Sequence, residues 1–237
     1  MPRILNIIAS INRRFSTTKS IPKSKFATKF AIGCGIVGFV GNEPAQDYIF
    51  EGLHILRSRG YDSAGITTIS ENPKTCSNPK QSLDQSSNGF NKKTANHSLK
   101  TTKFASINVS DSFDLVKKAA QSIHSKNFCG IGHTRWATHG GKTDINAHPH
   151  TDQHNRIAVV HNGTIENFAV LKKELQSENY RFVSDTDTEV IAQLISFFYD
   201  SEQKNLVAAV RIAASKLQGT YGLAILCRDL PGRIIAV

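Results

Sequence analysis

The 237-residue chain carries 29 Lys and Arg residues against 19 Asp and Glu, giving a formal net charge of +10 at pH 7, and 39% of its residues are hydrophobic. No apolar run reaches the roughly 18 residues that a membrane-spanning helix needs, so a soluble chain without a membrane partner is predicted. The cysteines lack CxxC spacing, and a long charged chain is unlike a secreted disulfide scaffold, which favours a reducing compartment.

The positive charge is concentrated in two segments. Residues 1–33 hold seven Lys or Arg and no acidic residue, and residues 71–108 hold six Lys against two acidic residues. The rest of the chain is left with a net charge of −1. A basic face of the kind that binds nucleic-acid phosphates is not indicated, so we predict no nucleic-acid partner.

The first 33 residues are predicted to be a basic leader outside the folded domain. Their acid-free, Ser- and Thr-rich composition is typical of an organellar transit peptide, and a disordered basic tail is the alternative. The stretch RRFST resembles a mitochondrial cleavage pattern, but a cut after Phe15 leaves residues 16–33 attached. The expected location is therefore mitochondrial or cytoplasmic.

The remaining chain alternates between strand-like and helix-like patterns. Pro44 is suited to opening a helix, apolar side chains then recur every three to four residues, and Gly60 is suited to ending it. Strands are predicted at 35–41, 64–70, 128–136, 156–163, 221–229 and 233–237, and further helices at 110–126, 166–180, 187–200 and 205–219. The order is not a regular βαβ alternation, so a layered α+β sandwich is predicted.

One segment interrupts this pattern. Residues 71–108 are rich in Ser, Asn and Lys with few apolar side chains, so they cannot repay the entropy lost on ordering. We predict a low-complexity surface insertion there, within a domain that spans residues 34–237.

The polar motifs each have an ordinary explanation when taken singly. Cys34 beside a strand is most simply a buried core thiol, and Arg135 a member of a surface ion pair. Thr186 and Glu189 fit a helix capping box. The histidines suggest metal, but HExxH is absent and HPH lacks helical i, i+4 geometry, so we predict neither a metal site nor a cofactor.

Taken together, the motifs occur in a specific order. They are CGIVG (34–38), RGYDSAG (59–65), HTRWATHG (133–140), NAHPH (146–150), HNG (161–163) and SDTDTEV (184–190). This series resembles the class II glutamine amidotransferases, which are N-terminal-nucleophile hydrolases, and within them the glutaminase domain of the glutamine:fructose-6-phosphate aminotransferases. Amidophosphoribosyltransferases share some of these elements and are an alternative. The resemblance implies a four-layer αββα sandwich of two antiparallel sheets.

The resemblance also implies roles for particular residues. Cys34 is the nucleophile that attacks the side-chain amide of L-glutamine, and its own α-amine is the base. Asn162 and the Gly163 N–H stabilise the oxyanion. Arg135 and Asp187 bind the carboxylate and the ammonium of the substrate. The remaining implied residues are Trp136, Thr138, His139 and His148 in the glutamine pocket and Arg59 and Gly60 in support of the nucleophile.

The chain departs from the family pattern in two ways. Cys34 follows Gly33 in a peptide bond, so its nitrogen is not basic until a cut at this bond exposes it. The sugar-phosphate isomerase domains that accept the ammonia and bind fructose 6-phosphate do not lie within residues 34–237. The chain is therefore expected to be a fragment, a subunit of a split enzyme or a degenerate copy. The six ordered motifs favour an enzyme domain that releases ammonia from glutamine, and an inactive glutamine-binding or regulatory module is the alternative.

Overall fold

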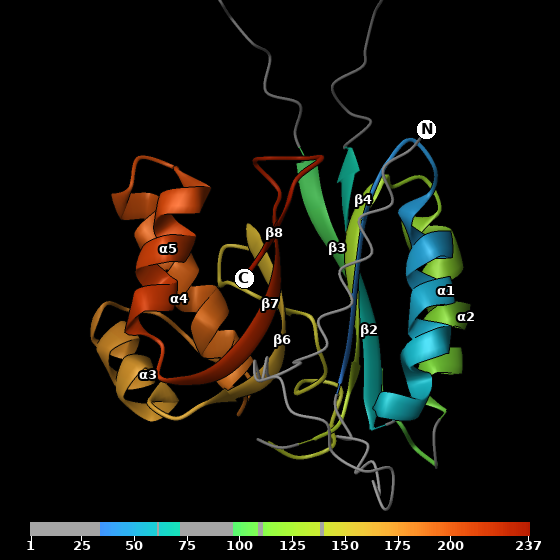
Figure 1. Cartoon of the computed structure of the whole chain (residues 1–237), viewed down its shortest axis with the longest axis horizontal. Helices are drawn as coiled ribbons and strands as arrows, with labels where there is room; N and C mark the ends of the chain where they lie inside the picture. The colour runs from blue at the N-terminus through green and yellow to red at the C-terminus, as the bar shows by residue number, and fades with distance from the viewer. Residues whose placement is uncertain (1–33, 61, 72–96, 109–110, 138–139) are drawn as a thin grey trace, which may run out of the picture.

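The computed structural model describes residues 34–60, 62–71, 97–108, 111–137 and 140–237 (Figure 1). Within these residues the chain forms two four-stranded antiparallel sheets that pack face to face. Helices cover the outer faces of both sheets (Figure 1). The predicted leader, residues 1–33, lies outside the described residues.

The first sheet has the strand order β1-β4-β2-β3. Its strands are β1 (Gly35–Val40), β2 (Ser63–Glu71), β3 (His97–Ala105) and β4 (Cys129–Arg135). Its outer face is covered by α1 (Ala45–Leu56), which continues into the short 3₁₀ helix η1 (Arg57–Arg59), and by α2 (Ser112–His124). The helix predicted between Pro44 and Gly60 is confirmed, because α1 begins directly after Pro44 and η1 ends directly before Gly60.

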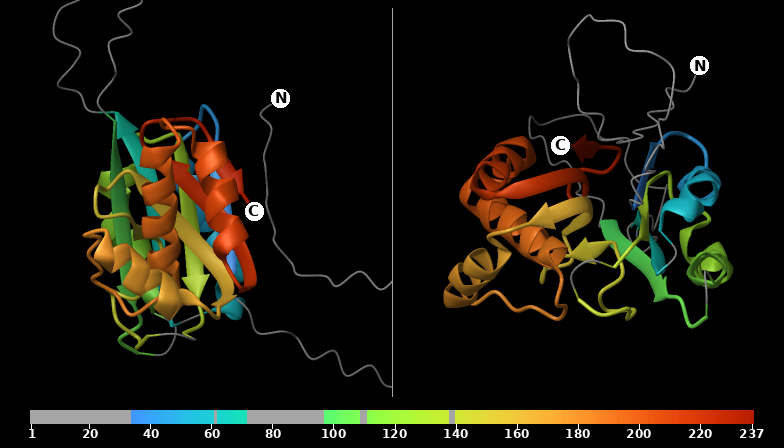
Figure 2. Two further views of the ribbon diagram at one scale, coloured as in Figure 1. Left: turned by 90° about the vertical axis from the view of Figure 1, so that its left-hand side faces the viewer. Right: turned by 60° about the horizontal axis from the view of Figure 1, so that its bottom comes forward.

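The second sheet has the strand order β5-β6-β7-β8. Its strands are β5 (His150–Thr151), β6 (Ile157–Ile165), β7 (Gly219–Cys227) and β8 (Ile234–Ala236). Its outer face carries α3 (Phe168–Ser177), α4 (Asp187–Ser201) and α5 (Leu206–Lys216). Figure 2 shows these helices and the α1–α2 pair on opposite sides of the sheets.

Apolar clusters fill the spaces between the layers. Ile49 and Leu53 lie in the cluster under α1, and Ile191 lies in the cluster between α4 and the second sheet. A further cluster joins the two sheets and includes Ile131 of β4 and Val160 of β6. The predicted four-layer αββα architecture is thereby confirmed.

The predicted insertion at residues 71–108 is wrong for Glu71, which ends β2, and for residues 97–105. Residues 97–105 form β3, which pairs with β2 along its whole length, from Ser63 opposite Ala105 to Glu71 opposite His97. Leu99 and Thr102 are buried, so this segment belongs to the fold despite its Lys and Thr content. The interior of the predicted insertion, residues 72–96, lies outside the described residues.

The predicted capping box at the start of α4 is only half formed. The Glu189 N–H donates to Thr186 Oγ1 at 3.3 Å, as a capping box requires. The Glu189 carboxylate accepts from the N–H groups of Val183 and Ser184 at 2.9 and 2.6 Å. Glu189 therefore secures the loop that leads into α4, rather than the cap residue itself.

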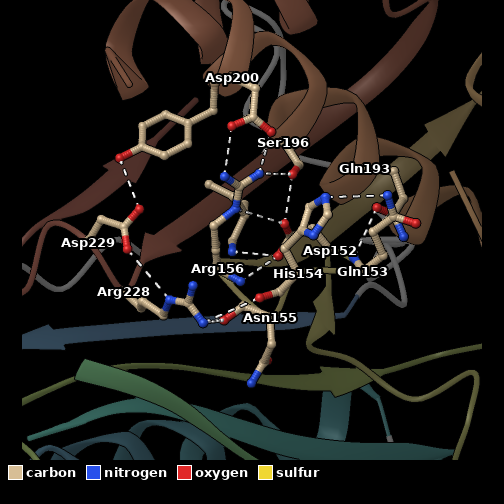
Figure 3. Close-up of polar contacts among 12 residues, drawn as sticks. Asp152, Gln153, His154, Asn155, Arg156, Gln193, Ser196, Asp200, Arg228 and Asp229 are labelled. Carbon is tan, nitrogen blue, oxygen red and sulfur yellow. Dashed lines mark hydrogen bonds and ion pairs between the residues drawn. The ribbon is translucent and has the colours of Figure 1, made fainter. Parts of the chain in front are cut away.

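A polar network fixes the turn between β5 and β6 (Figure 3). Asp152 Oδ1 accepts from the N–H groups of Arg156 and Ile157 at 2.6 and 2.8 Å, and Asp152 Oδ2 accepts from Ser196 Oγ at 2.7 Å. The Arg156 guanidinium contacts both carboxylate oxygens of Asp200 at 2.8 and 2.6 Å, which raises the pKa of Arg156 and lowers the pKa of Asp200. Because Ser196 and Asp200 belong to α4, the network ties the start of β6 to that helix.

None of the helices in the described residues is long and apolar enough to cross a membrane.

Candidate active site

Cys34 directly precedes β1, and strand pairing brings it beside the end of β4. β1 and β4 are antiparallel, with Gly35 opposite Thr134. The Trp136 N–H donates to Cys34 Sγ at 3.1 Å, and Sγ lies 3.6 Å from the Trp136 carbonyl oxygen. The predicted nucleophile and one predicted pocket residue are therefore in contact.

Some groups around Cys34 raise the pKa of its thiol and others lower it. Burial raises the pKa of the Cys34 thiol, and the nearby Asp62 carboxylate adds to this. The Trp136 N–H and the Arg135 charge lower the pKa in part. Because a thiolate is the reactive form, this thiol needs a base before it attacks a substrate.

Asn162 faces Cys34 across the interface between the two sheets. Asn162 Nδ2 donates to the Cys34 carbonyl oxygen at 2.8 Å. Ala158 and Val160, four and two residues earlier on β6, lie in the cluster that joins the sheets. The two-residue period of a strand therefore carries Asn162 to the same face, at the end of the apolar stretch.

Arg135, the last residue of β4, carries a buried positive charge. Its guanidinium donates to the carbonyl oxygens of residues 140–141 at 3.4 and 3.5 Å, and Arg135 is only 3% exposed. Burial lowers the pKa of Arg135, while the charges of Cys34, Asp62 and Asp187 raise it. The guanidinium is therefore within electrostatic reach of both Cys34 and Asp187.

Asp187 is the first residue of α4, where helix N–H groups stabilise a negative charge. Asp187 Oδ2 accepts from the Ile165 N–H at 2.9 Å, and Oδ1 lies 3.8 Å from His161 Nδ1. Arg135 and Asp187 therefore carry opposite charges within electrostatic reach of each other.

Asp62 holds the backbone next to Trp136. Its Oδ2 accepts from the Ala137 N–H at 2.9 Å, and its Oδ1 lies 3.3 Å from Lys142 Nζ. The Asp62 N–H donates to the Arg135 carbonyl oxygen at 3.1 Å. The RGYDSAG motif thus fixes both ends of the segment that follows β4.

Buried imidazoles continue from Asn162 into the interior. His133 Nε2 lies 2.8 Å from Asn162 Oδ1 and 3.1 Å from the His161 carbonyl oxygen, and the Nδ1 atoms of His133 and His148 are 3.1 Å apart. Thr188 Oγ1 lies 2.7 Å from His148 Nε2 and 3.1 Å from His161 Nδ1. Burial lowers the pKa of His133 to about 3 and the pKa of His148 well below its ordinary value, so both rings are neutral at pH 7.

The two predicted glycines lie where backbone segments approach closely. A Cβ atom at Gly60 would lie 2.8 Å from the Arg135 carbonyl carbon. Gly163 has a φ of +134°, and a Cβ atom there would clash with the Thr220 carbonyl oxygen. Gly60 therefore allows η1 to pack against the end of β4, and Gly163 allows β6 to stay close to β7.

Some of the predicted site residues lie outside the part of the chain that the structure describes. Thr138 and His139 lie outside the described residues, and so does the side chain of Arg59. His148 is 5% exposed and contacts His133, one step removed from Asn162. In the described part of the chain, no group of three or more His, Cys, Asp and Glu side chains is placed to hold a metal ion.

A cavity of about 600 Å³ lies between β3 and the segment around His150, and none of the predicted site residues that the structure describes is among its lining residues. Leu99, Lys103 and Glu189 are among its lining residues. Lys103 Nζ donates to the carbonyl oxygen of Ala147 at 2.7 Å, and burial lowers the pKa of Lys103 to about 8. This lysine fixes the segment that leads into His148.

Sequence reasoning does not single out His133, Thr188 or Asp62. For His133 a signal exists, because Cys129 and Ile131 precede it at the two-residue period of β4 and lie in the cluster between the sheets. Thr188 and Asp62 lie inside recognised motifs, but their contacts involve residues that are distant in the chain. Only the fold reveals those contacts.

Comparisons with known proteins agree on one kind of domain. A profile of the glutamine amidotransferase domain matches residues 118–225. The glutamine–fructose-6-phosphate aminotransferase (isomerizing) of Caldanaerobacter subterraneus is 40% identical over 203 residues, which are 86% of this chain and 28% of that protein. The protein of the same name from Clostridium acetobutylicum is 39% identical over 204 residues, with the same coverage of 86% and 28%.

A solved structure shares the fold. The glutamine phosphoribosylpyrophosphate amidotransferase from B. subtilis, complexed with ADP and GMP, matches with a TM-score of 0.58 and 25% identity over 83% of this chain and 35% of that chain. This chain spans only 28% of the length of the curated relatives. Because the profile, the relatives and the solved structure all point to the same domain, the chain belongs to the class II glutamine amidotransferase domain family.

Proposed function

We propose that residues 34–237 hydrolyse the side-chain amide of L-glutamine to glutamate and ammonia. The observation that carries this proposal is the convergence on Cys34 of the Trp136 N–H, 3.1 Å from Sγ, and of Asn162 Nδ2, 2.8 Å from the Cys34 carbonyl oxygen. A held thiol beside an amide donor is the combination that acyl transfer through a thioester requires.

The proposed reaction begins once the α-amine of Cys34 is free. This amine accepts the thiol proton, because its reference pKa of about 7.7 to 8.0 suits a base at neutral pH. The sulfur then attacks the amide carbon of glutamine, and the amide oxygen takes up the negative charge. The proton passes to the nitrogen as the C–N bond breaks, which releases ammonia and leaves a glutamyl thioester. Water, deprotonated by the same amine, attacks the thioester. The C–S bond then breaks, glutamate is released, and the proton returns from the amine to the Cys34 sulfur.

The other residues bind the substrate and the oxyanion in this proposal. Asn162 Nδ2 and the Gly163 N–H stabilise the oxyanion, where loss of one donor typically costs about 10²- to 10³-fold in kcat. Arg135 binds the α-carboxylate of glutamine and Asp187 binds its ammonium. The proposed pocket also includes Trp136, Thr138, His139 and His148, with Arg59 and Gly60 as its support.

We propose further that the ammonia serves glucosamine 6-phosphate synthesis. The support is the name shared by the curated relatives and the pairing of HTRWATHG with NAHPH in this chain. Because this chain spans 28% of those relatives, we assign the sugar chemistry to a sugar-phosphate isomerase domain or subunit that binds fructose 6-phosphate.

The test compares two forms of the protein, the full chain and the chain that begins at Cys34. Each form is assayed for glutamate and ammonia release and for covalent labelling by an electrophilic glutamine analogue. Cys34→Ala is the test variant. Cys129→Ala is the matched control, because Cys129 is a buried thiol whose pKa is raised by burial to about 11.

We expect the form that begins at Cys34 to release ammonia and to take up label, and Cys34→Ala to do neither. Cys129→Ala should retain both properties. Glutamine binding without labelling in the form that begins at Cys34 would contradict the proposal and support the inactive regulatory module. N-terminal mass spectrometry of the protein from its own cells then shows whether Cys34 is exposed there.

A further inference from the structure

The contacts of His133 restrict where its proton lies. His133 Nε2 faces two oxygens, the His161 carbonyl oxygen at 3.1 Å and Asn162 Oδ1 at 2.8 Å. A backbone carbonyl oxygen is always an acceptor and cannot exchange places with a donor. His133 Nε2 must therefore carry the N–H, whichever way the Asn162 amide is turned.

A proton on His133 Nε2 fixes the orientation of the Asn162 amide. The amide end that faces His133 must be the acceptor, Oδ1, because an NH₂ group there would oppose an N–H donor. The other end, Nδ2, then points to Cys34, whose carbonyl oxygen it reaches at 2.8 Å. A reversed amide would place an oxygen against the Cys34 carbonyl oxygen and remove the donor from the site.

The contacts behind His133 determine which atoms of His148 and Thr188 carry protons. Neutral His133 leaves its Nδ1 bare, so the 3.1 Å contact between the two Nδ1 atoms places a proton on His148 Nδ1. His148 Nε2 is then an acceptor, and Thr188 Oγ1 donates to it at 2.7 Å, while the Thr188 oxygen accepts from His161 Nδ1 at 3.1 Å. Thr188 Oγ1 also lies 3.4 Å from Asp187 Oδ1, a longer contact than the one to His148.

In this series of hydrogen bonds, which runs from His161 through Thr188, His148 and His133, every donor points toward Asn162. Hydrogen bonds aligned in one direction polarise each other, particularly in a low-dielectric interior. These hydrogen bonds lie in such an interior, since His133 and Thr188 are 0% exposed and His161 is 3% exposed. An amide whose oxygen accepts a strong hydrogen bond is a better donor at its nitrogen, which is the atom that faces Cys34.

We propose that His133 is a positioning residue for Asn162, holding the amide so that Nδ2 faces Cys34, with His148 and Thr188 fixing the tautomer of His133. This proposal deepens the proposed function and rests on it for its consequence in catalysis. The tautomers themselves are a separate claim that holds whether or not the protein turns over glutamine.

The tautomers are tested by ¹⁵N NMR of the histidine-labelled protein that begins at Cys34. We expect a proton on His133 Nε2 and on His148 Nδ1 at pH 7, with the signals assigned by loss in His133→Gln and His148→Gln. In His133→Leu, the side-chain NH₂ protons of Asn162 should exchange faster with solvent. A proton on His133 Nδ1 would overturn the proposal, even in a protein without glutaminase activity.

The catalytic consequence is tested by steady-state kinetics of glutamine hydrolysis. We expect His133→Leu to lower kcat about 100-fold with little change in KM, because the loss approaches that of one oxyanion donor. His133→Gln should have a kcat about tenfold higher than that of His133→Leu, since a glutamine amide can place an N–H near the position of Nε2. His124→Gln is the control for the loss of a buried imidazole outside the site.

A double-mutant cycle separates positioning from a general effect on folding. In an Asn162→Ala background, His133→Leu should have no further effect on kcat, because the group that it positions is already gone. Multiplicative losses in the double variant would show that His133 acts independently of Asn162 and would refute the proposal. If the parent protein releases no ammonia, the proposed function fails, and the NMR result alone decides the positioning claim.

Discussion

His124 is a buried imidazole whose neutral form supports the fold. It is 0% exposed at the end of α2, with Nδ1 2.7 Å from Thr68 Oγ1 and Nε2 2.9 Å from Thr102 Oγ1. Both strands that it contacts, β2 and β3, belong to the first sheet. Burial lowers the pKa of His124 from 6.5 to about 4, because a charged ring would lose its hydration.

This shift predicts a loss of stability in acid. Below pH 6.5 the unfolded chain binds a proton at this ring, whereas the folded chain binds one only below about pH 4. The unfolded state therefore gains protons first, and the contribution of His124 is lost as the pH falls from 6.5 to 4. The shift corresponds to about 3 kcal/mol in total, of which about 2 kcal/mol is lost by pH 5.

The assay is urea unfolding of the protein and of His124→Gln at several pH values between 7.5 and 5. The variant loses some stability at pH 7.5, but the difference in unfolding free energy between the two proteins should shrink by about 2 kcal/mol by pH 5. His54→Gln, which removes an exposed imidazole from α1, is the control for losing one histidine. A difference that stays constant with pH would refute the reasoning.

Three further predictions concern the binding site, the β2–β3 connection and the turn before β6. Arg135→Lys should raise the KM for glutamine about tenfold or more in steady-state assays, because a lysine cannot bind the carboxylate in two places; an unchanged KM would remove this role. Replacing residues 72–96 by Asn-Gly should shift the melting temperature by only a few degrees, since Glu71 and His97 are paired, whereas a deletion through Leu99 should destabilise the protein strongly; a large loss in the first variant would contradict this. Arg156→Met should lower the free energy of unfolding in urea by about 2 kcal/mol because Asp152 and Asp200 lose their shared partner, while exposed Arg211→Met should have little effect; equal effects would be evidence against the network.

Most helices and strands were predictable because their apolar residues follow the period of the element. β3 was not, since its buried residues Leu99, Thr102 and Ala105 are spaced by three rather than two. It is an edge strand of the first sheet, and its exposed lysine and threonine residues give it the composition of a loop. Its place in the sheet depends on pairing with β2, which the local sequence does not reveal.

The candidate site was predictable where its residues lie in ordered motifs, as Cys34, Asn162 and Arg135 do. The contacts behind Asn162 were not predictable, although His148 itself was an expected pocket residue. His133 and Asn162 are 29 residues apart and belong to different sheets, so their contact depends on how the sheets face each other. His148 and Thr188 are 40 residues apart, and their contact depends on how α4 packs against the second sheet.

The 2.8 Å contact between Asn162 and Cys34 spans two separately built layers. Cys34 leads into a strand of one sheet, Asn162 lies on a strand of the other, and apolar side chains such as Ile131 and Val160 set the spacing between them. The length of this contact therefore depends on the distance between the two sheets. A substitution that thickens or thins this interior by a fraction of an ångström moves the two halves of the site apart or together while leaving both sheets intact. The volume of the apolar side chains between the sheets is thus constrained by the geometry of the site as well as by stability. Substitutions in this interior must conserve that volume.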